Sequence, residues 1–314
     1  MARVGIIGTG FIGRAWAISF ARAGHDVVLW DGQQDAPANA LAYIEALLPD
    51  LAANGLLDEA PEAVRARMSV APTLEEALAG VAYVQESTFE DVAIKREIFS
   101  RMDALAPADA VLASSTSAIL PSKFTEHLAG RARCVVVHPL NPPYVIPAAE
   151  VVPAPWTSQD TVDRAAAFLR GAGHAPIVMK RELDGFVMNR MQAALMEEAF
   201  RLVAEGYASV EDVDIGLREG LALRWSIIGP FETADLNAPG GVRDYVMRYR
   251  GVFDALFPSQ QRRADWTGPV LDVIERERRA RLPASELPAR QAWRDRNLMA
   301  LMAHKRRAAK TLGS

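Results

Sequence analysis

The sequence predicts an α/β fold, in which a doubly wound, mostly parallel sheet is followed by an all-helical C-terminal domain. In the first half of the 314-residue chain, short apolar runs alternate with amphipathic stretches. This alternation is typical of a parallel sheet with helices on both faces. A glycine-rich turn at 8–13 follows the first apolar run and opens a helical stretch. After Leu183 the pattern becomes helical, and no run typical of a strand follows.

The expected strands share short apolar runs between turn residues. They are Arg3–Ile7, Asp26–Trp30, Tyr83–Gln85, Ala110–Ala113, Arg133–Val137, Ala148–Pro153 and Ala175–Lys180. The helices expected between them are Phe11–Ala23, Ala38–Ala53, Asp91–Leu105, Pro121–Leu128 and Gln159–Ala172. The later helices are Val187–Gly206, Val210–Glu219, Gly241–Leu256, Pro269–Arg281 and Pro288–Lys305. We place the boundary near Asp184-Gly185, which gives two domains, residues 1–184 and 185–314.

Composition and charge exclude several classes of function. The chain has 35 Lys and Arg against 39 Asp and Glu, a net charge of −4, so we expect no nucleic-acid partner. Cys134 is the only cysteine, which excludes a disulfide framework and a Cys-based zinc site; we expect no metal. No apolar run approaches the roughly 20 residues of a membrane helix. The N-terminus has no signal-peptide pattern, and we expect a cytoplasmic protein without a membrane partner.

The glycine-rich turn predicts a dinucleotide site of the Rossmann type. The motif G-x-G-x-x-G is matched by Gly8, Thr9, Gly10, Phe11, Ile12 and Gly13. Its glycines permit a tight turn, a close approach of pyrophosphate and close helix–strand packing. Asp31 ends the next strand, 18 residues after Gly13. A carboxylate there binds the ribose hydroxyls and repels a 2′-phosphate, so the sequence favours NAD over NADP. The alternative is a turn that merely closes a βαβ unit.

Polar residues follow two neighbouring strands at the edge where doubly wound folds bind ligands. Ser117 lies just after the strand Ala110–Ala113, and His138 follows Arg133–Val137. A histidine can take a proton from an alcohol during hydride transfer. Glu150, 12 residues later, can orient that histidine and stabilise the imidazolium. Structural alternatives are a strand-end histidine, an edge-strand charge at Glu150 and a helix cap at Ser117.

The chain resembles the 3-hydroxyacyl-CoA dehydrogenase superfamily, and within it the lambda-crystallin / L-gulonate 3-dehydrogenase branch. The resemblance covers nearly the whole chain. It runs through GTGFIGRAWA, SSTSAILPSKF, HPLNPPYVIPAAEVVP, DGFVMNRMQ, EGLALRWSIIGPFETADLNAPGG and RQAWRDRNLM. The last two segments are specific to the branch. The resemblance implies an NAD-dependent dehydrogenase, with residues 1–184 binding NAD and 185–314 serving substrate binding and dimerisation.

The resemblance also implies a role for individual residues. His138 matches the catalytic base and Glu150 its carboxylate partner. Ser117 and Asn189 match residues that contact the substrate hydroxyl and hold the reacting oxygen, and Asn141, in the same stretch as His138, is a further substrate-binding candidate. Two more residues match positions near the nicotinamide ribose, namely Glu90 and Lys95. Asn189 has its own structural alternative, because it could simply sit in the first turn of its helix.

The charge pattern favours a free hydroxy acid as substrate. Relatives that act on acyl-CoA place serine and lysine near the coenzyme on the helical region after the second strand. Here residues 23–64 hold eight acids and no Lys or Arg, which disfavours a CoA phosphate. Arg224 is the candidate cation for a substrate carboxylate, since a guanidinium binds it with two parallel bonds; its structural alternative is a surface or helix-cap arginine.

The leading hypothesis is oxidation of the 3-hydroxyl of a free hydroxy acid, with L-gulonate first. The alternatives are a 3-hydroxyacyl-CoA dehydrogenase, a carnitine 3-dehydrogenase in which Trp225 faces the quaternary ammonium, and a non-catalytic crystallin-like protein. A homodimer through the helical domain is also implied. Burial of its apolar helices within one subunit is the alternative.

Overall fold

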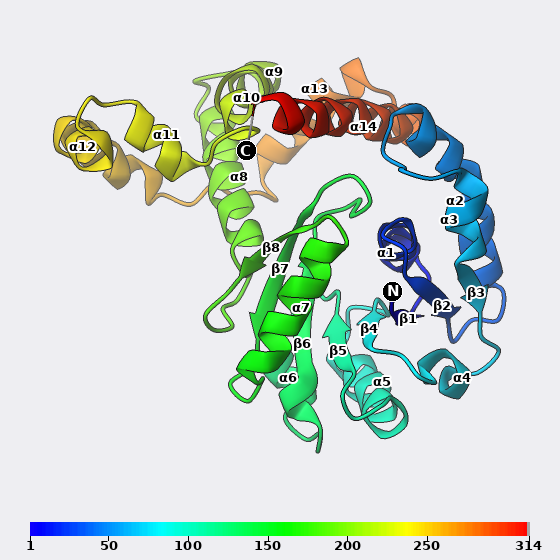
Figure 1. Cartoon of the computed structure of the whole chain (residues 1–314). Coiled ribbons are helices and arrows are strands. Elements are labelled where there is room, and N and C mark those ends of the chain that lie inside the picture. The colour runs from blue at the N-terminus through cyan, green and yellow to red at the C-terminus, as the bar shows by residue number, and fades with distance from the viewer. Residues whose placement is uncertain (313–314) are drawn as a thin grey trace. The chain divides into compact units, whose positions relative to one another are not determined.

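The computed structural model describes residues 1–312, and within them eight strands form one sheet (Figure 1). They are β1 (Arg3–Ile7), β2 (Asp26–Trp30), β3 (Met68–Val70), β4 (Tyr83–Glu86), β5 (Val111–Ser114), β6 (Cys134–Pro139), β7 (Ala148–Pro153) and β8 (Ala175–Val178). Their order is β3-β2-β1-β4-β5-β6-β7-β8. Strands β1 to β6 pair in parallel, β7 is antiparallel to β6, and β8 is parallel to β7. The expected doubly wound, mostly parallel sheet is confirmed.

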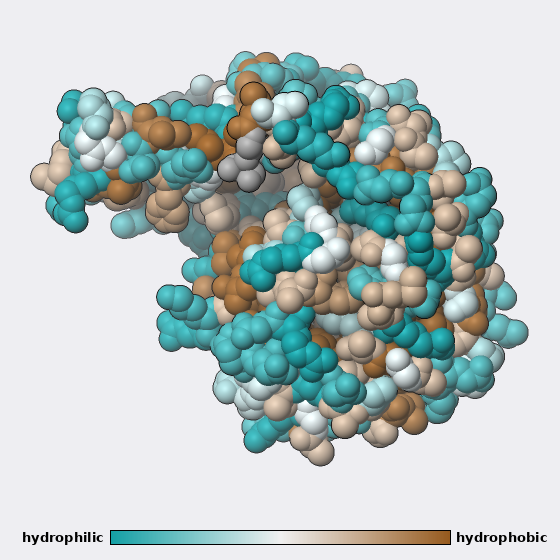
Figure 2. Space-filling model, viewed as in Figure 1, coloured by the Kyte–Doolittle hydropathy of each residue, from teal (hydrophilic) through white to brown (hydrophobic). Residues whose placement is uncertain are grey.

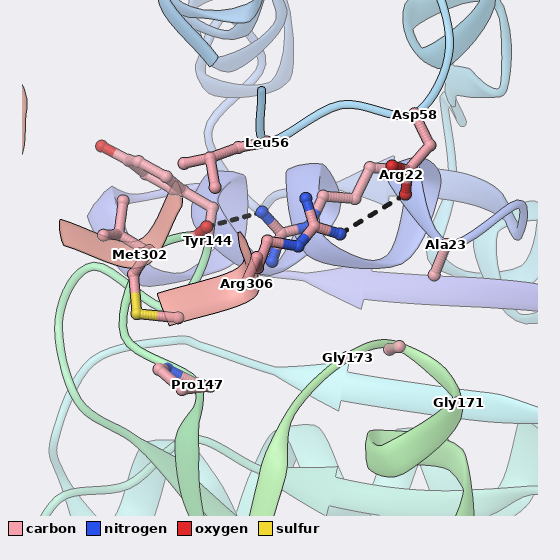
Figure 3. Close-up of a pocket in the computed structure, with 12 residues that line it drawn as sticks. Arg22, Ala23, Leu56, Asp58, Tyr144, Pro147, Gly171, Gly173, Met302 and Arg306 are labelled. Atoms are coloured by element: carbon pink, nitrogen blue, oxygen red, sulfur yellow. Dashed lines mark hydrogen bonds and ion pairs between the residues drawn. The ribbon is translucent and has the colours of Figure 1, made fainter. Parts of the chain in front are cut away.

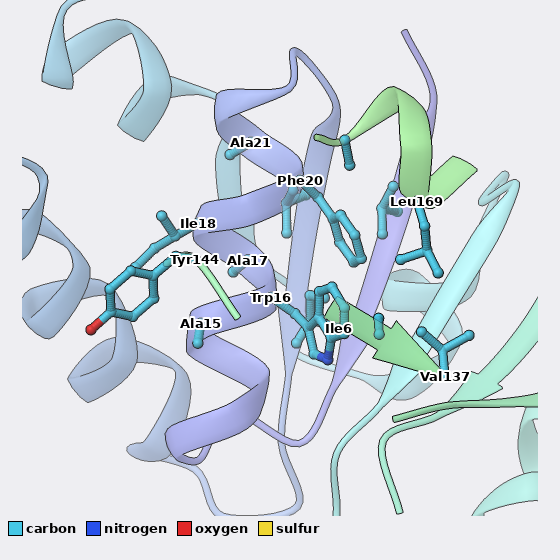
Figure 4. Packing of buried hydrophobic residues seen from close by; sticks show 14 of the residues in the cluster. Ile6, Ala15, Trp16, Ala17, Ile18, Phe20, Ala21, Val137, Tyr144 and Leu169 are labelled. Carbon is cyan, nitrogen blue, oxygen red and sulfur yellow. The ribbon is translucent and has the colours of Figure 1, made fainter. Parts of the chain in front are cut away.

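Helices cover both faces of this sheet. They are α1 (Phe11–Arg22), α2 (Ala36–Ala53), α3 (Pro61–Ala66), α4 (Leu74–Leu78), α5 (Val92–Leu105), α6 (Pro121–Thr125), the 3₁₀ turn η1 (Arg131–Arg133) and α7 (Gln159–Gly171). Alternate residues of β6 contribute to two separate clusters, because successive side chains of a strand point to opposite faces. One cluster includes α1, α2 and α7, and the other α4, α5 and α6. In Figure 4, Trp16 and Phe20 of α1 point toward the strands, with Ile18 and Tyr144 on the other side of the helix.

The second half of the chain is helical, as expected. Its elements are α8 (Met188–Ala204), α9 (Val210–Ile215), the π-helix η2 (Gly216–Leu221), α10 (Ala222–Trp225), α11 (Pro230–Leu236), α12 (Gly241–Gln260), α13 (Pro269–Arg281), the 3₁₀ turn η3 (Ala284–Glu286) and α14 (Leu287–Leu312). Contacts divide the chain into two compact units. One contains Met1–Met188 together with the chain from Gln291 onward, and the other contains Asn189–Arg290. None of the helices in residues 1–312 is long and apolar enough to cross a membrane.

The structure contains short elements that the sequence pattern does not predict, namely β3, α3, α4, α10 and α11, and it assigns most of α14 to the first unit. Strand β3 was not expected, because its three residues include only one buried side chain, Met68. Helix α11 was also not expected, since it is short and begins at Pro230. We expected residues 185–314 to form the second domain, but the chain from Gln291 onward, which contains most of α14, belongs to the first unit. Such a return depends on contacts between residues far apart in the sequence, which no local pattern indicates.

Helix α14 packs against the region that follows β2. Arg296 lies 3.3 Å from Asp50, and Arg306 lies 3.4 Å from Asp58. Met299 is buried in the same cluster as the apolar face of α2. Two acids of the segment without Lys or Arg, Asp50 and Asp58, therefore pair with cations of the C-terminal helix.

Candidate active site

The turn between β1 and α1 has the geometry that a dinucleotide needs. Gly8 has a φ of +90°, and a Cβ there would lie 2.7 Å from the backbone of Ser87. A Cβ at Gly13 would lie 1.9 Å from the carbonyl oxygen of Gly8, so any side chain would separate helix from strand. A Cβ at Gly10 would meet nothing within 4 Å. The first and third glycines are thus required by packing, and the second leaves open space where a pyrophosphate approaches the backbone.

Asp31 stands at the end of β2 and is held by this turn. Its carboxylate accepts hydrogen bonds from the amide of Thr9 at 2.7 Å and from the Thr9 hydroxyl at 3.1 Å. The amide of Gln33 donates to the other carboxylate oxygen at 3.0 Å. A cavity of about 520 Å³ lies beside these residues and is also lined by Trp30 and Phe89. The residues present therefore fit a bound dinucleotide, with the carboxylate available to ribose hydroxyls.

Arg14 is a cavity residue that the sequence analysis missed. It lies in the first turn of α1 and lines the same cavity. Its guanidinium lies 3.5 Å from the ring centre of Tyr43 and 4.5 Å from that of Phe11. The sequence signal that could have indicated Arg14 is its position, one residue after the glycine motif.

His138 and Glu150 are direct partners across the β6–β7 pair. His138 Nδ1 lies 2.7 Å from Glu150 Oε2, and both side chains are buried. A carboxylate can only accept, so Nδ1 carries the proton and Nε2 keeps its lone pair. The pair can therefore present an oriented base, with a charge behind it that stabilises the protonated ring.

Glu150 is fixed by two backbone amides at the start of α8. Its Oε1 accepts hydrogen bonds from the amides of Val187 at 2.6 Å and Met188 at 2.9 Å. Phe186, just before them, has a φ of +50° and a fully buried ring 5.6 Å from that of His138. A bulky residue in this conformation costs on the order of 1 kcal/mol. The surrounding contacts stabilise this conformation, which aims both amides at Glu150.

Ser117 lies in the loop after β5, and a single carboxylate holds that loop. Glu90 Oε1 accepts hydrogen bonds from the Thr116 hydroxyl at 2.5 Å and from the amides of Ser117 and Ala118 at 2.9 and 3.0 Å. Because β5 and β6 are parallel neighbours, Ser117 lies at the same sheet edge as His138. The side chain of Glu90 thus fixes the position of the Ser117 backbone.

A buried ion pair lies beneath this loop. Lys95 Nζ contacts both carboxylate oxygens of Glu86 at 3.0 and 3.2 Å, and Glu90 at 3.8 Å. Glu86 also accepts from the Ser114 hydroxyl at 2.5 Å and from the amide and hydroxyl of Thr88, each at 2.6 Å. Glu86 is not predicted from the sequence, because an acid at a strand end gives no sign of its partners. The expected contact of Glu90 and Lys95 with the nicotinamide ribose stays a prediction.

The remaining candidates are Asn141, Asn189 and Arg224. Asn141 is exposed in the loop after β6. Asn189 directly follows Met188 and is half-buried on α8. Arg224 is exposed on α10. Their roles stay predictions. Within residues 1–312, no group of three or more His, Cys, Asp or Glu side chains could hold a metal ion.

Comparison with protein families gives two matches in sequence order. Residues 3–182 match the NAD binding domain of 3-hydroxyacyl-CoA dehydrogenase. Residues 185–267 match the C-terminal domain of the same family. The two matches together cover most of the chain and confirm the resemblance seen in the sequence.

Similar proteins agree with this assignment. Lambda-crystallin of Oryctolagus cuniculus is 38% identical over 96% of this chain and 95% of its own length. L-carnitine dehydrogenase of Streptomyces griseus is 41% identical over 79% of this chain and 73% of its own length. The structure of an NAD⁺-dependent dismutase, 5-formyl-3-hydroxy-2-methylpyridine 4-carboxylic acid 5-dehydrogenase, superimposes with a TM-score of 0.81 at 28% identity, covering 96% of this chain and 97% of that chain. The protein therefore belongs to the 3-hydroxyacyl-CoA dehydrogenase family and is an NAD-dependent oxidoreductase.

Proposed function

We propose that the protein oxidises the 3-hydroxyl of a free hydroxy acid, with L-gulonate as the first candidate. The observation that carries the chemistry is the buried His138–Glu150 pair, 2.7 Å apart. His138 Nε2 takes the hydroxyl proton, and Glu150 stabilises the imidazolium that forms. Ser117 and Asn189 donate hydrogen bonds to the oxygen as it becomes a carbonyl. When bound, NAD supplies the hydride acceptor for this oxidation.

The substrate class rests on what surrounds α2. In relatives that act on acyl-CoA, the helical region after the second strand lies near the coenzyme. In this chain α14 lies against that region, where Asp50 and Asp58 pair with Arg296 and Arg306. Residues 23–64 themselves contribute eight acids and no Lys or Arg that could contact a phosphate of coenzyme A. This arrangement favours a substrate without coenzyme A.

A free acid needs a cation for its carboxylate, and we propose Arg224 for this role. Its exposure on α10 leaves the guanidinium available for a bidentate contact. The lambda-crystallin relative, which aligns over almost all of both chains, favours L-gulonate. L-Carnitine is the second candidate, because L-carnitine dehydrogenases reach 41% identity and it is also a free 3-hydroxy acid.

A substrate panel tests this function. NADH formation is followed with L-gulonate, 3-hydroxybutyrate and L-carnitine, and NADH loss is followed with acetoacetyl-CoA. We expect the largest kcat/KM with one of the free acids, and a rise in KM for that acid in Arg224→Met. Arg250→Met is the matched control, since Arg250 lies in the same unit and pairs with Asp254. A preference for acetoacetyl-CoA would reverse the proposed substrate class.

We also propose a homodimer formed through the second unit. Large apolar side chains are exposed there, including Phe231 at 85%, Met247 at 75% and Ile227 at 72%. Figure 2 shows such hydrophobic residues on the surface around α11. None of the 20 residues of α12 is buried, and exposed apolar patches of this kind mark interfaces. Sedimentation at several concentrations should give twice the chain mass, whereas a monomer throughout would contradict the proposal.

A further inference from the structure

A second cavity in the first unit lies outside the dinucleotide cavity and the His138–Glu150 pair. Its volume is about 230 Å³, far above the roughly 10–15 Å³ that one water requires. Its wall combines the last turn of α1, the loop after α2, the loop before β7, the turn after α7 and one face of α14 (Figure 3). Segments distant in sequence therefore line one cavity that is open to solvent.

Arg22 is the most confined cation of this wall. Its Nη1 donates to the carbonyl oxygen of Tyr144 at 2.6 Å, and it forms no ion pair with any carboxylate in residues 1–312. Burial and the positive charge of Arg306 together lower the pKa of Arg22 to about 10, against an opposing effect of the Asp58 carboxylate. A guanidinium in this setting has lost hydration and faces a like charge, so an anion would relieve both penalties.

Arg306 brings the second guanidinium from α14. Figure 3 shows it beside that of Arg22. Its Nη1 donates to the carbonyl oxygen of Gly55 at 3.2 Å and its Nη2 to Asp58 at 3.4 Å. Asp58 is 82% exposed, so its charge is screened by solvent and compensates little. The two cations thus line the same cavity, and the carboxylate that contacts Arg306 is solvated.

More positive charge lies next to this cavity. Arg307 and Lys310 line a smaller, adjoining cavity that shares Asp58 and Arg306 with the first. In a chain whose net charge is −4, this end of α14 is a local concentration of cations. The remaining wall is apolar, with Leu56 and Met302, and suits the carbon skeleton of a small organic ligand.

We propose that this cavity binds a small phosphate dianion, either inorganic phosphate or a phosphate monoester, between Arg22 and Arg306. Guanidinium groups present paired donors that match phosphate oxygens. Because Arg22 belongs to α1 and Arg306 to α14, the bound dianion ties the C-terminal helix to the sheet unit. Binding at this site therefore stabilises the docked position of α14.

The test titrates inorganic phosphate, and separately glycerol 3-phosphate, into the full chain saturated with NADH at constant ionic strength. NADH occupies the pyrophosphate site, so the heat of binding and the rise in Tm report on another site. We expect the wild type to show both a heat of binding and a rise in Tm. Arg306→Met and Arg22→Met should weaken binding by about tenfold or more, because each removes a charge-assisted contact. A tighter Kd for the monoester than for phosphate would identify an organic ligand.

The controls separate the cavity from other arginines and from folding. Arg164→Met removes an arginine of the same unit that lies outside the cavity and pairs with Asp160, and it should bind phosphate like the wild type. Arg306 is 44% exposed, so its variant tests the site even if Arg22→Met fails to fold. All variants that fold should keep the wild-type Kd for NADH. No binding by the wild type, or equal phosphate affinity in Arg306→Met and Arg164→Met, would overturn the proposal.

Discussion

Replacing Glu150 with Gln tests the base–orienter pair with the smallest change in shape. The wild-type carboxylate accepts from three donors, namely His138 Nδ1 and the amides of Val187 and Met188. A glutamine has one oxygen. If that oxygen faces His138, its NH₂ meets two backbone N–H groups, and each unsatisfied donor costs about 1–3 kcal/mol. The oxygen therefore faces the backbone, and the NH₂ faces His138.

That orientation of the glutamine side chain reverses the tautomer of the His138 ring. Nδ1 must then accept, so the proton moves to Nε2, which can no longer take a proton from a substrate. Losing the carboxylate beside a buried imidazolium costs about 3–5 kcal/mol, which corresponds to a loss of about 10²–10⁴-fold in kcat.

The assay is steady-state NADH formation with the best free hydroxy acid, alongside NADH titration by fluorescence. NADH affinity should be unchanged, because the dinucleotide cavity does not include Glu150. Glu45→Gln is the matched control, since Glu45 is 56% exposed and pairs with Arg65, and its kcat should equal that of the wild type. Wild-type turnover in a folded Glu150→Gln enzyme would show that the Glu150 carboxylate does not orient His138.

Three further predictions concern the first unit. Asp31→Ser should raise the KM for NAD by about 10–100-fold, because charged hydrogen bonds are worth about 1.5–3 kcal/mol. It should also narrow the preference of the enzyme for NAD over NADP. An unchanged ratio of kcat/KM for the two cofactors would contradict the role of Asp31. Burial and the charge of Arg22 lower the pKa of His174 from 6.5 to about 4, so the unfolded chain takes up the proton first as pH falls between these values. The free energy of unfolding should therefore fall by about 2–3 kcal/mol across that window in urea titrations, and His174→Gln should remove this part of the slope; an equal slope in both proteins would count against it. Burial raises the pKa of the Cys134 thiol to about 12, so a thiol reagent at mildly alkaline pH should label the protein only after denaturation, and rapid labelling of the native chain would show that the thiol is accessible.

The sequence predicts local elements of the fold better than long-range contacts. Strands β1, β2 and β7 have the expected bounds, because each is an apolar run between turn residues. The three-residue β3 escapes such a pattern, since it exposes two of its side chains. The return of α14 was also not predictable, because Asp50 and Arg296 are separated by 246 residues.

The same limit applies to the site. His138 and Glu150 could be paired in advance, because the short connection between two adjacent apolar strands brings them opposite each other. The role of Glu90 as an acceptor for the Ser117 loop could not be predicted, since it depends on how two loops meet. The absence of Lys and Arg from residues 23–64 was visible in the sequence, but only the structure shows its counterpart in the arginines of α14.

His138 is the proposed base in NAD-dependent oxidation of a free hydroxy acid, and His138→Ala removes it. NADH formation by this variant is measured under saturating NAD. We expect kcat to fall by about 10²–10⁴-fold or more, with an unchanged Kd for NADH, since the cavity of the dinucleotide lies at the β1–α1 turn. Turnover near that of the wild type in His138→Ala would show that another group takes the hydroxyl proton.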